Sequence, residues 1–173
     1  MRRGRAFGGG SPLSIDKTLF RLIAGSFATG VTVVTTGRAG AYHGMTASSF
    51  ASLSLDPSYV LVCIDRQAET LPMLQDTGAF NVNILTEEQE ELSRQFAIKQ
   101  SPQAHGLEGV DYSLGKTGLP VLKGCLAYFE CRIAQQFDGG DHIIFVGEVL
   151  DGGLVVDAAP LAYYRGVYRR LAQ

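Results

Sequence analysis

Short hydrophobic segments separated by glycine, proline and aspartate recur along most of the chain. Many are rich in Val, Ile, Thr and Phe, and several alternate apolar with polar residues, which is typical of β-strands. We expect strands at residues 31–36, 41–45, 59–64, 80–85 and in the two arms of a hairpin over 125–150. The continuous apolar run at 59–64 predicts a strand buried on both faces, and one or two short strands are expected to close the chain.

Three segments carry the spacing and end signals of helices. Ser14 is expected to cap a first helix, whose apolar residues continue at helical spacing up to Gly30. Thr70 and Gly78 bracket a second, two-turn helix, because glycine suits the left-handed conformation that ends many helices. Residues 86–97 begin with a capping-box pattern and predict a third helix. Helices are therefore few and short beside the strands.

The order of these elements predicts a mainly β fold with small α insertions. Strands and helices do not alternate, so a doubly wound parallel sheet is disfavoured and a β-barrel is favoured. A length of 173 residues fits one domain. We therefore expect an Arg- and Gly-rich tail at residues 1–13, followed by one domain at residues 14–173.

Charge and cysteine content exclude several classes of function. Fifteen Lys and Arg against seventeen Asp and Glu give a net charge of −2, whereas nucleic-acid and anionic-membrane binders need a basic surplus. The chain has no apolar run of about 18 residues and no signal-like segment near its start, so we expect a cytoplasmic protein without membrane contact. The three cysteines form no Cys-x-x-Cys pair, which predicts reduced thiols and no metal site.

The segment His43–Ser52 is rich in hydroxyl groups and nearly free of charge. Four of the seven residues from Thr46 to Ser52 are Ser or Thr. Hydroxyls and free backbone N–H groups can bond the carbonyls and ring nitrogens of a planar heterocycle, and small side chains let it approach the backbone. An ordinary Ser/Thr-rich loop between two strands has the same composition, so both interpretations stay open.

Three further segments each allow a functional and a structural interpretation. Residues 65–70 join a strand to a helix N-terminus, which together with Arg66 suits a phosphate, or forms only a capped helix with a solvated arginine. Asn81 and Asn83 share one face of a strand, where they bind either a ligand or a neighbouring strand. His142 follows a Gly-Asp turn, where an isolated histidine is more often structural than functional.

Together these segments form an ordered series that resembles one known family. The series comprises residues 43–52, 54–57, 62–64, 80–85, 95–97, 140–142, 147–149 and 160–168. It resembles the short-chain flavin reductases, the reductase components of two-component flavin-dependent monooxygenases, over nearly the whole domain. The resemblance implies an FMN-binding split β-barrel of Greek-key type, a homodimer, and reduction of FMN or FAD by NADH, with NADPH left open. Reduced flavin would then diffuse to a partner monooxygenase.

The resemblance also implies roles for individual residues. For binding of the flavin and nicotinamide cofactors it implies Thr46, Ala47, Ser48, Ser49, Ser52, Cys63, Asp65, Arg66, Thr70, Phe80, Asn81, Val82, Phe96, Ala97, Asp141, His142, Tyr164 and Arg165. Among these, His142 would meet the nicotinamide nucleotide and is the candidate catalytic residue. One departure is Ala68, where many relatives carry a serine, so one hydroxyl contact is missing on the phosphate side.

Flavin reduction requires little specialised chemistry from the protein side chains. Hydride transfer between two bound rings needs orientation and exclusion of water, so a sequence without a catalytic triad suits it. A non-catalytic flavin-binding or electron-carrier module on the same barrel is the alternative, and the Gly-Asp-His turn at His142 favours the enzyme. A homodimer would cover an open sheet edge, with Tyr163, Tyr164 and Tyr168 as candidate interface residues.

Overall fold

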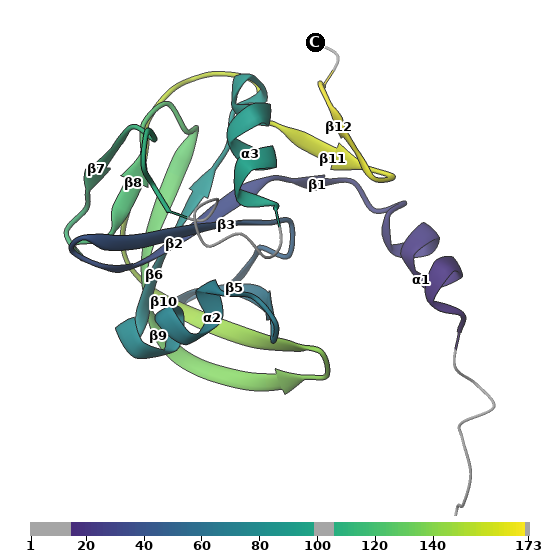
Figure 1. Cartoon of the computed structure of the whole chain (residues 1–173), viewed down its shortest axis with the longest axis horizontal. Helices are drawn as coiled ribbons and strands as arrows, with labels where there is room; N and C mark the ends of the chain where they lie inside the picture. Colours follow the sequence, from purple (N-terminus) through teal and green to yellow (C-terminus); the bar gives the residue numbers. More distant parts are fainter. Residues whose placement is uncertain (1–14, 99–105, 172–173) are drawn as a thin grey trace, which may run out of the picture.

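The computed structural model describes residues 15–98 and 106–171, so the predicted tail at 1–13 lies outside the described residues. The fold is mainly β, as predicted. The helices are α1 (Lys17–Ala24), α2 (Thr70–Thr77), the 3-10 turn η1 (Glu87–Gln89) and α3 (Glu90–Phe96). The strands are β1 (Thr29–Gly30), β2 (Thr32–Arg38), β3 (Ala41–Ala47), β4 (Ala51–Leu55), β5 (Ser58–Asp65), β6 (Ala79–Ile84), β7 (Tyr112–Leu114), β8 (Pro120–Leu122), β9 (Ala127–Gly139), β10 (His142–Leu154), β11 (Ala162–Tyr164) and β12 (Val167–Arg169). Figure 1 shows most strands grouped in one body with α2 and α3, while α1 and the β11–β12 hairpin lie to one side.

One antiparallel sheet of seven strands forms the centre of the molecule, in the order β3-β2-β6-β9-β10-β5-β4. β9 and β10 form the hairpin predicted over 125–150, with two register shifts along its length. The glycine at one shift is required by packing, because a Cβ on Gly147 would lie 2.5 Å from the Phe80 ring. Smaller sheets join β1 to β11–β12 and β7 to β8.

Strand β5 corrects one expectation about burial. The continuous apolar run predicted a strand buried on both faces, but burial alternates along β5. Val60, Val62 and Ile64 are in the core, while Leu61 and Cys63 between them are only half-buried. One face of the strand therefore packs into the core, while Cys63 and Asp65 on the other face line a cavity.

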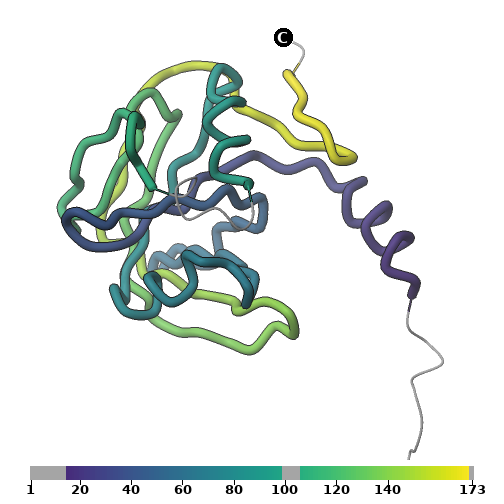
Figure 2. Tube along the Cα trace, in the orientation of Figure 1, coloured from purple at the N-terminus to yellow at the C-terminus, as the bar shows by residue number. Residues whose placement is uncertain are grey.

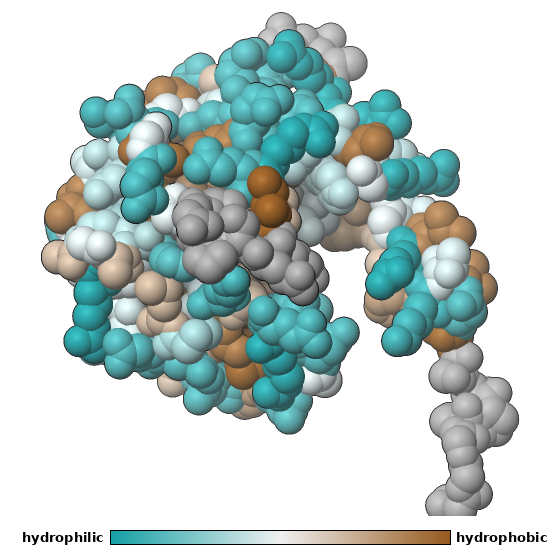
Figure 3. Space-filling model, in the orientation of Figure 1, coloured by the Kyte–Doolittle hydropathy of each residue, from teal (hydrophilic) through white to brown (hydrophobic). Residues whose placement is uncertain are grey.

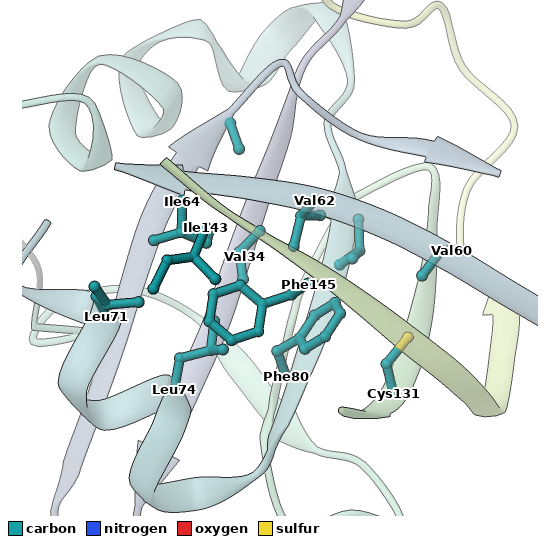
Figure 4. Packing of buried hydrophobic residues seen from close by; sticks show 12 residues of the cluster. Val34, Val60, Val62, Ile64, Leu71, Leu74, Phe80, Cys131, Ile143 and Phe145 are labelled. Atoms are coloured by element: carbon teal, nitrogen blue, oxygen red, sulfur yellow. The ribbon is translucent and has the colours of Figure 1, made fainter. Parts of the chain in front are cut away.

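The main core lies between the sheet and helix α2. Figure 4 shows Phe80 and Phe145 side by side in this cluster, with Val34 and Leu74 near them, and all four side chains are fully buried. Gly78 ends α2 in the left-handed conformation, at φ 69°, as the sequence predicted. Burial of these apolar side chains holds α2 against β2, β3 and β6.

A second core cluster supports helix α3. The predicted capping box is present: the Thr86 hydroxyl accepts from the Gln89 backbone, and the Gln89 side chain accepts from the Thr86 N–H at 3.1 Å. Phe96 is fully buried at the far end of α3 and packs with Val31, Val33 and other residues of this cluster. The ring of Phe96 occupies the space above Gly44, where any Cβ would lie within 2.7 Å of it.

The first helix is shorter than predicted and stands apart from the sheet. Its N-cap is Asp16, whose carboxylate accepts from the Leu19 N–H at 3.1 Å, and it ends at Gly25. No residue of α1 is buried. Figures 1 and 2 show α1 (purple) projecting from the body on the segment that leads into β1. The predicted cap at Ser14 lies outside the described residues.

A buried carboxylate fastens the segment between β7 and β8. Glu130 of β9 is 1% exposed and accepts from the Lys116 N–H at 3.0 Å, the Thr117 N–H at 2.8 Å and the Thr117 hydroxyl at 2.6 Å. Gly115 passes so close that a Cβ there would meet the Glu130 carboxylate. The polar, Gly-rich segment is thereby given a defined structure, which its sequence did not predict.

Candidate active site

One cavity gathers most of the predicted site residues. Its volume is about 360 Å³, within the usual range for small-molecule sites. It lies where the end of β3, the end of β5, the start of α2, the end of α3 and the start of β10 meet. The lining residues are Met45, Thr46, Ala47, Ser48, Ser49, Cys63, Asp65, Gln67, Ala68, Glu69, Thr70, Phe96, Ala97, Ile98 and His142. These residues come from four separate parts of the sequence.

Two of the predicted hydroxyls hold the cavity wall in place. The Thr46 hydroxyl donates to the Ser93 carbonyl of α3 at 2.7 Å. The Ser49 hydroxyl donates to the Cys63 carbonyl at 2.9 Å and accepts from the Cys63 N–H at 3.1 Å. Both groups therefore already have partners within the protein. The segment presents small side chains and backbone to the cavity instead of a row of free hydroxyls.

Thr70 contributes a buried hydroxyl to the residues that line the cavity. The residue is 1% exposed, and its Oγ1 has no hydrogen-bond partner among the described residues. Leaving a buried hydroxyl unpaired costs about 1–3 kcal/mol, so such groups are rare without a reason. Thr70 begins α2, where backbone N–H groups and the helix dipole favour a negative or electron-rich group. A polar ligand group at this end of the cavity would satisfy the hydroxyl.

His142 borders the cavity from the first position of β10. It pairs with Asp65 across the β5–β10 ladder, which fixes its place beside the end of β5. Its Nδ1 lies 2.8 Å from the Asp141 carboxylate. This hydrogen bond to His142 lowers the pKa of the exposed Asp141 carboxyl. The predicted turn therefore brings the imidazole to the cavity, while Asp141 itself does not line it.

Cys63 also lines the cavity. Partial burial raises the pKa of this thiol above its ordinary value. The thiol form is therefore favoured at neutral pH, and nothing here activates it as a nucleophile. Cys63 contributes shape and a polarizable surface beside the Ser49 contact.

The Arg66 side chain, predicted to suit a phosphate, lies against the β9–β10 turn. Its Nε donates to the Gly140 carbonyl at 2.8 Å, and its Nη2 lies 2.8 Å from the Asp138 carboxylate. Its backbone N–H donates to the Asp141 carbonyl at 2.9 Å. Arg66 is not among the lining residues, because its side chain is directed at the β9–β10 turn.

The strand β6 does not complete the pocket as expected. Phe80 and Val82 are fully buried in the main core. Asn81 is also fully buried, and its side-chain amide donates to the Leu119 and Pro120 carbonyls, both at 3.2 Å. Alternation along the strand sends Phe80 and Val82 to the core and Asn81 to the segment beside β8. Asn81 therefore forms the inter-segment contacts of the structural alternative, and it is not brought to the cavity.

Asn83 has the same kind of role as Asn81. Its amide donates to the Val33 carbonyl at 3.1 Å, and its Oδ1 accepts from the Leu122 N–H at 2.9 Å. The two buried amides thus fasten β8 to the sheet. Neither reaches the cavity.

Three other predicted residues also lie elsewhere in this chain. Ser52 is exposed on β4. Tyr164 and Arg165 lie on the β11–β12 hairpin, where the Arg165 guanidinium is 5.2 Å from the Tyr164 ring centre. Arg165 lines a different cavity, of about 420 Å³, beside Arg21 and Gly25 at the end of α1. None of the three borders the cavity that holds His142.

The cavity includes residues that the sequence had not marked for a site. Met45 lies within the hydroxyl-rich segment, Gln67 and Glu69 lie in the turn before α2, and Ile98 follows α3. Their types carry no chemical signal, since each is common on an ordinary protein surface. Only their adjacency to predicted site segments could have suggested them.

Within residues 15–98 and 106–171, no group of three or more His, Cys, Asp or Glu side chains is placed to hold a metal ion. In the same part of the chain, no helix has the length and apolar character needed to cross a bilayer.

A family model described as the flavin reductase like domain matches residues 24–172. The chain belongs to this family. It is 38% identical, over 89% of its length and 82% of the relative's, to the reductase subunit HsaB of a flavin-dependent monooxygenase from Mycobacterium tuberculosis H37Rv. It is also 38% identical, over 91% of its length and 87% of the relative's, to an NADH-dependent FAD reductase of Streptomyces globisporus.

Solved structures of the flavin reductase family agree with the fold. The NADH:FAD oxidoreductase SgcE6 of Streptomyces globisporus, in complex with NAD and FAD fragments, matches with a TM-score of 0.84 at 38% identity, covering 91% of this chain and 93% of that one. Nitrilotriacetate monooxygenase component B from Mycobacterium thermoresistibile matches with a TM-score of 0.85 at 35% identity, covering 90% and 87%.

Proposed function

We propose that this flavin reductase-like chain is an NADH-dependent flavin reductase that reduces FMN or FAD. The observation that carries the proposal is the cavity that joins the Thr46–Ser49 segment, the unpaired Thr70 hydroxyl and His142. Relatives named as NADH-dependent FAD and flavin reductases support the choice of reaction. NADPH is the alternative hydride donor.

The cavity residues suit different parts of a flavin. The small side chains at Ala47 and Ser48 let a flat ring lie against the wall that the Thr46 and Ser49 hydrogen bonds hold rigid. Thr70 and the start of α2 suit the ribityl chain or phosphate, because both offer donors to electron-rich oxygens. His142, which lines the same cavity and is partly exposed, would border the nicotinamide.

The chemistry itself belongs to the two nucleotides: NADH gives a hydride to the flavin, and a proton from solvent completes the reduced ring. The protein has to hold the two rings in contact and keep water out. Phe96, which is fully buried, and the cavity-lining Ala97 and Ile98 supply an apolar wall for this purpose. No side-chain nucleophile or metal ion is required by this scheme.

We further propose that the sheet is the split barrel of this family and that the chain works as a homodimer. The support for the dimer is α1, whose Leu22 and Ile23 are 65% and 58% exposed. Figure 3 shows hydrophobic surface on this separate helical arm. A lone two-turn helix with exposed apolar side chains gains stability only when another surface covers it, and a second copy is the occupant we propose.

The proposed biological setting follows from the relatives. Several are named as reductase components of monooxygenases, including the 4-hydroxyphenylacetate 3-monooxygenase reductase of Thermus thermophilus. We propose that this chain likewise delivers reduced flavin to a partner monooxygenase. We also propose a cytoplasmic location, supported by the three free cysteines, and one domain over residues 14–173 with a tail at 1–13.

The test is NADH consumption with FMN, FAD and riboflavin added in turn, repeated with NADPH. We expect slow oxidation by the protein alone and fast oxidation once micromolar flavin is present. Flavin binding without consumption of either nucleotide would contradict the proposal and leave the non-catalytic flavin-binding module.

A further inference from the structure

The tip of the β9–β10 hairpin is an exposed arm that carries His142 at its base. Residues from Ala134 to Asp141 are all exposed. The ladder between β5 and β10 ends at the pair Asp65–His142, so the turn beyond this pair has no strand beside it. Core burial therefore does not fix the orientation of the turn. Some other contact has to do so.

Arg66 provides that contact, from the residue directly after β5. Its guanidinium binds the Gly140 carbonyl and the Asp138 carboxylate, and its backbone N–H binds the Asp141 carbonyl. The Asp138 carboxylate also accepts from the Gly140 N–H at 3.0 Å. One arginine thus reaches three residues of the turn, and its carboxylate partner closes the turn internally.

The electrostatics of the clamp agree with its geometry. The Arg66 hydrogen bond, together with the Gly140 N–H, lowers the pKa of the Asp138 carboxyl, so this group is ionised at neutral pH. An arginine suits the position better than a lysine, because its fixed fork of donors can serve a carboxylate and a carbonyl at once. Asp141, the residue that bonds the His142 ring, is itself held by the Arg66 backbone.

We propose that Arg66 is a positioning residue for the nicotinamide side of the site, acting through His142 and not by contact with flavin. The inference rests on the proposed function, in which His142 borders the nicotinamide. Arg66 fixes the turn, the turn fixes Asp141 and His142, and the imidazole then presents one orientation at the cavity rim. Loss of the clamp leaves the cavity walls in place but releases the rim.

The test is a double-mutant cycle on the full-length protein, with Arg66→Ala, His142→Ala and the double variant. In the parent background Arg66→Ala should raise the KM for NADH about fivefold, with a smaller change in kcat and flavin affinity within about twofold. In the His142→Ala background the same change should have less than about a twofold effect, because residues that act through one another are not additive. Hydrogen exchange at the turn amides should speed up in Arg66→Ala and in the double variant, but not in His142→Ala.

Two more variants complete the cycle. Arg66→Lys keeps the ion pair to Asp138 but loses the second donor, which binds the Gly140 carbonyl, so we expect an intermediate KM for NADH. This variant also tests the proposal if Arg66→Ala folds poorly. Arg38→Ala is the matched control, since Arg38 forms a similar exposed ion pair with Asp76, at 3.0 Å, outside the cavity lining. Its kinetics should equal those of the parent.

The outcomes separate the inference from the proposed function. Equal effects of Arg66→Ala with and without His142, or a matching loss of flavin affinity, would overturn the positioning role while flavin reduction stands. A parent-like KM in Arg66→Ala, with a raised KM in His142→Ala, would overturn it too. A protein that consumes no NADH would overturn the proposed function, and the positioning role with it.

Discussion

At the scale of single residues, the cavity lining contains polar groups that have partners within the protein and a buried hydroxyl that has none among the described residues. Thr46 and Ser49 form hydrogen bonds within the protein, whereas the Thr70 hydroxyl is buried without one. A group that gains its partner only on binding contributes to affinity without contributing to stability. This difference makes Thr70 and Asn81, both buried and polar, a useful pair to compare.

Thr70→Val should weaken flavin binding by about 1–3 kcal/mol, because the ligand loses a donor in a buried place. The free energy of unfolding should stay near the parent value or rise, since valine keeps the volume and removes an unpaired hydroxyl. Flavin titration and urea denaturation of the same preparations give both numbers. Unchanged flavin affinity would show that the ligand does not reach the start of α2.

Asn81→Ala is expected to behave in the opposite way. Its amide donates to two backbone carbonyls in the core, so the variant should lose about 1–3 kcal/mol of stability. Flavin affinity should be retained in the folded fraction. A variant with the stability of the parent but weaker flavin binding would show that Asn81 belongs to the flavin site.

His142→Ala tests the nicotinamide rim directly. We expect a higher KM for NADH and lower turnover, by about tenfold in kcat/KM, with flavin affinity near the parent value. Steady-state NADH titration beside a flavin-binding titration measures both effects. Kinetics equal to those of the parent would make this histidine an ordinary residue of the hairpin.

The sequence could predict that residues 46–49, 63–70 and His142 meet, but not what each hydroxyl binds. Thr46 meets a carbonyl 47 residues away in α3, and Ser49 meets the backbone of Cys63 on β5. Such partners depend on the packing of distant elements, which local composition does not encode. The partners of Arg66 likewise lie on a distant hairpin turn, so the local sequence, which suggested a phosphate, could not predict them.

At the scale of elements, local patterns were good guides where they included an end signal. The capping box at Thr86 and the glycine at Gly78 correctly predicted two helix ends, because these contacts lie within a few residues. The apolar run of β5 was misleading, since half-buried Leu61 and Cys63 are as apolar as their buried neighbours. The short strands β7 and β8 depend on Glu130, which lies outside their own segment.

Glu130→Gln should therefore destabilise the β7–β8 segment. The amide replaces one acceptor oxygen by a donor that faces other donors, and hydrogen bonds to a charged group are worth about 1.5–3 kcal/mol. We expect a loss of about 2 kcal/mol in the free energy of unfolding, measured by denaturant titration. A stability equal to that of the parent would mean that the contacts at Lys116 and Thr117 contribute little.

At the scale of the whole molecule, the exposed apolar face of α1 is the main feature that a single chain leaves unexplained. The Tyr163 and Tyr168 rings, expected at a dimer interface, pack against one another and against the chain's own second core. Tyr168 also shares a 2.8 Å hydrogen bond with Ser93 of α3. The helix is therefore the better candidate for the interface.

Leu22→Glu on α1 should convert the proposed dimer to a monomer, because a charge cannot be buried there without a partner. Sedimentation should give twice the 18.6 kDa chain mass for the parent and the chain mass for the variant. Leu114→Glu, at a residue of similar exposure on β7, is the control that should stay dimeric. A parent that sediments as a monomer at micromolar concentration would contradict the dimer.

The central claim is that the cavity reduces flavin with NADH, and an anaerobic stoichiometric assay tests it most directly. NADH and flavin are mixed with a trace of the protein, and loss of NADH absorbance is followed beside bleaching of the oxidised flavin. The account predicts one flavin bleached for each NADH consumed, at a rate that Thr70→Val lowers through the flavin KM and His142→Ala through the NADH KM. Tight flavin binding with no bleaching at any NADH concentration would contradict it.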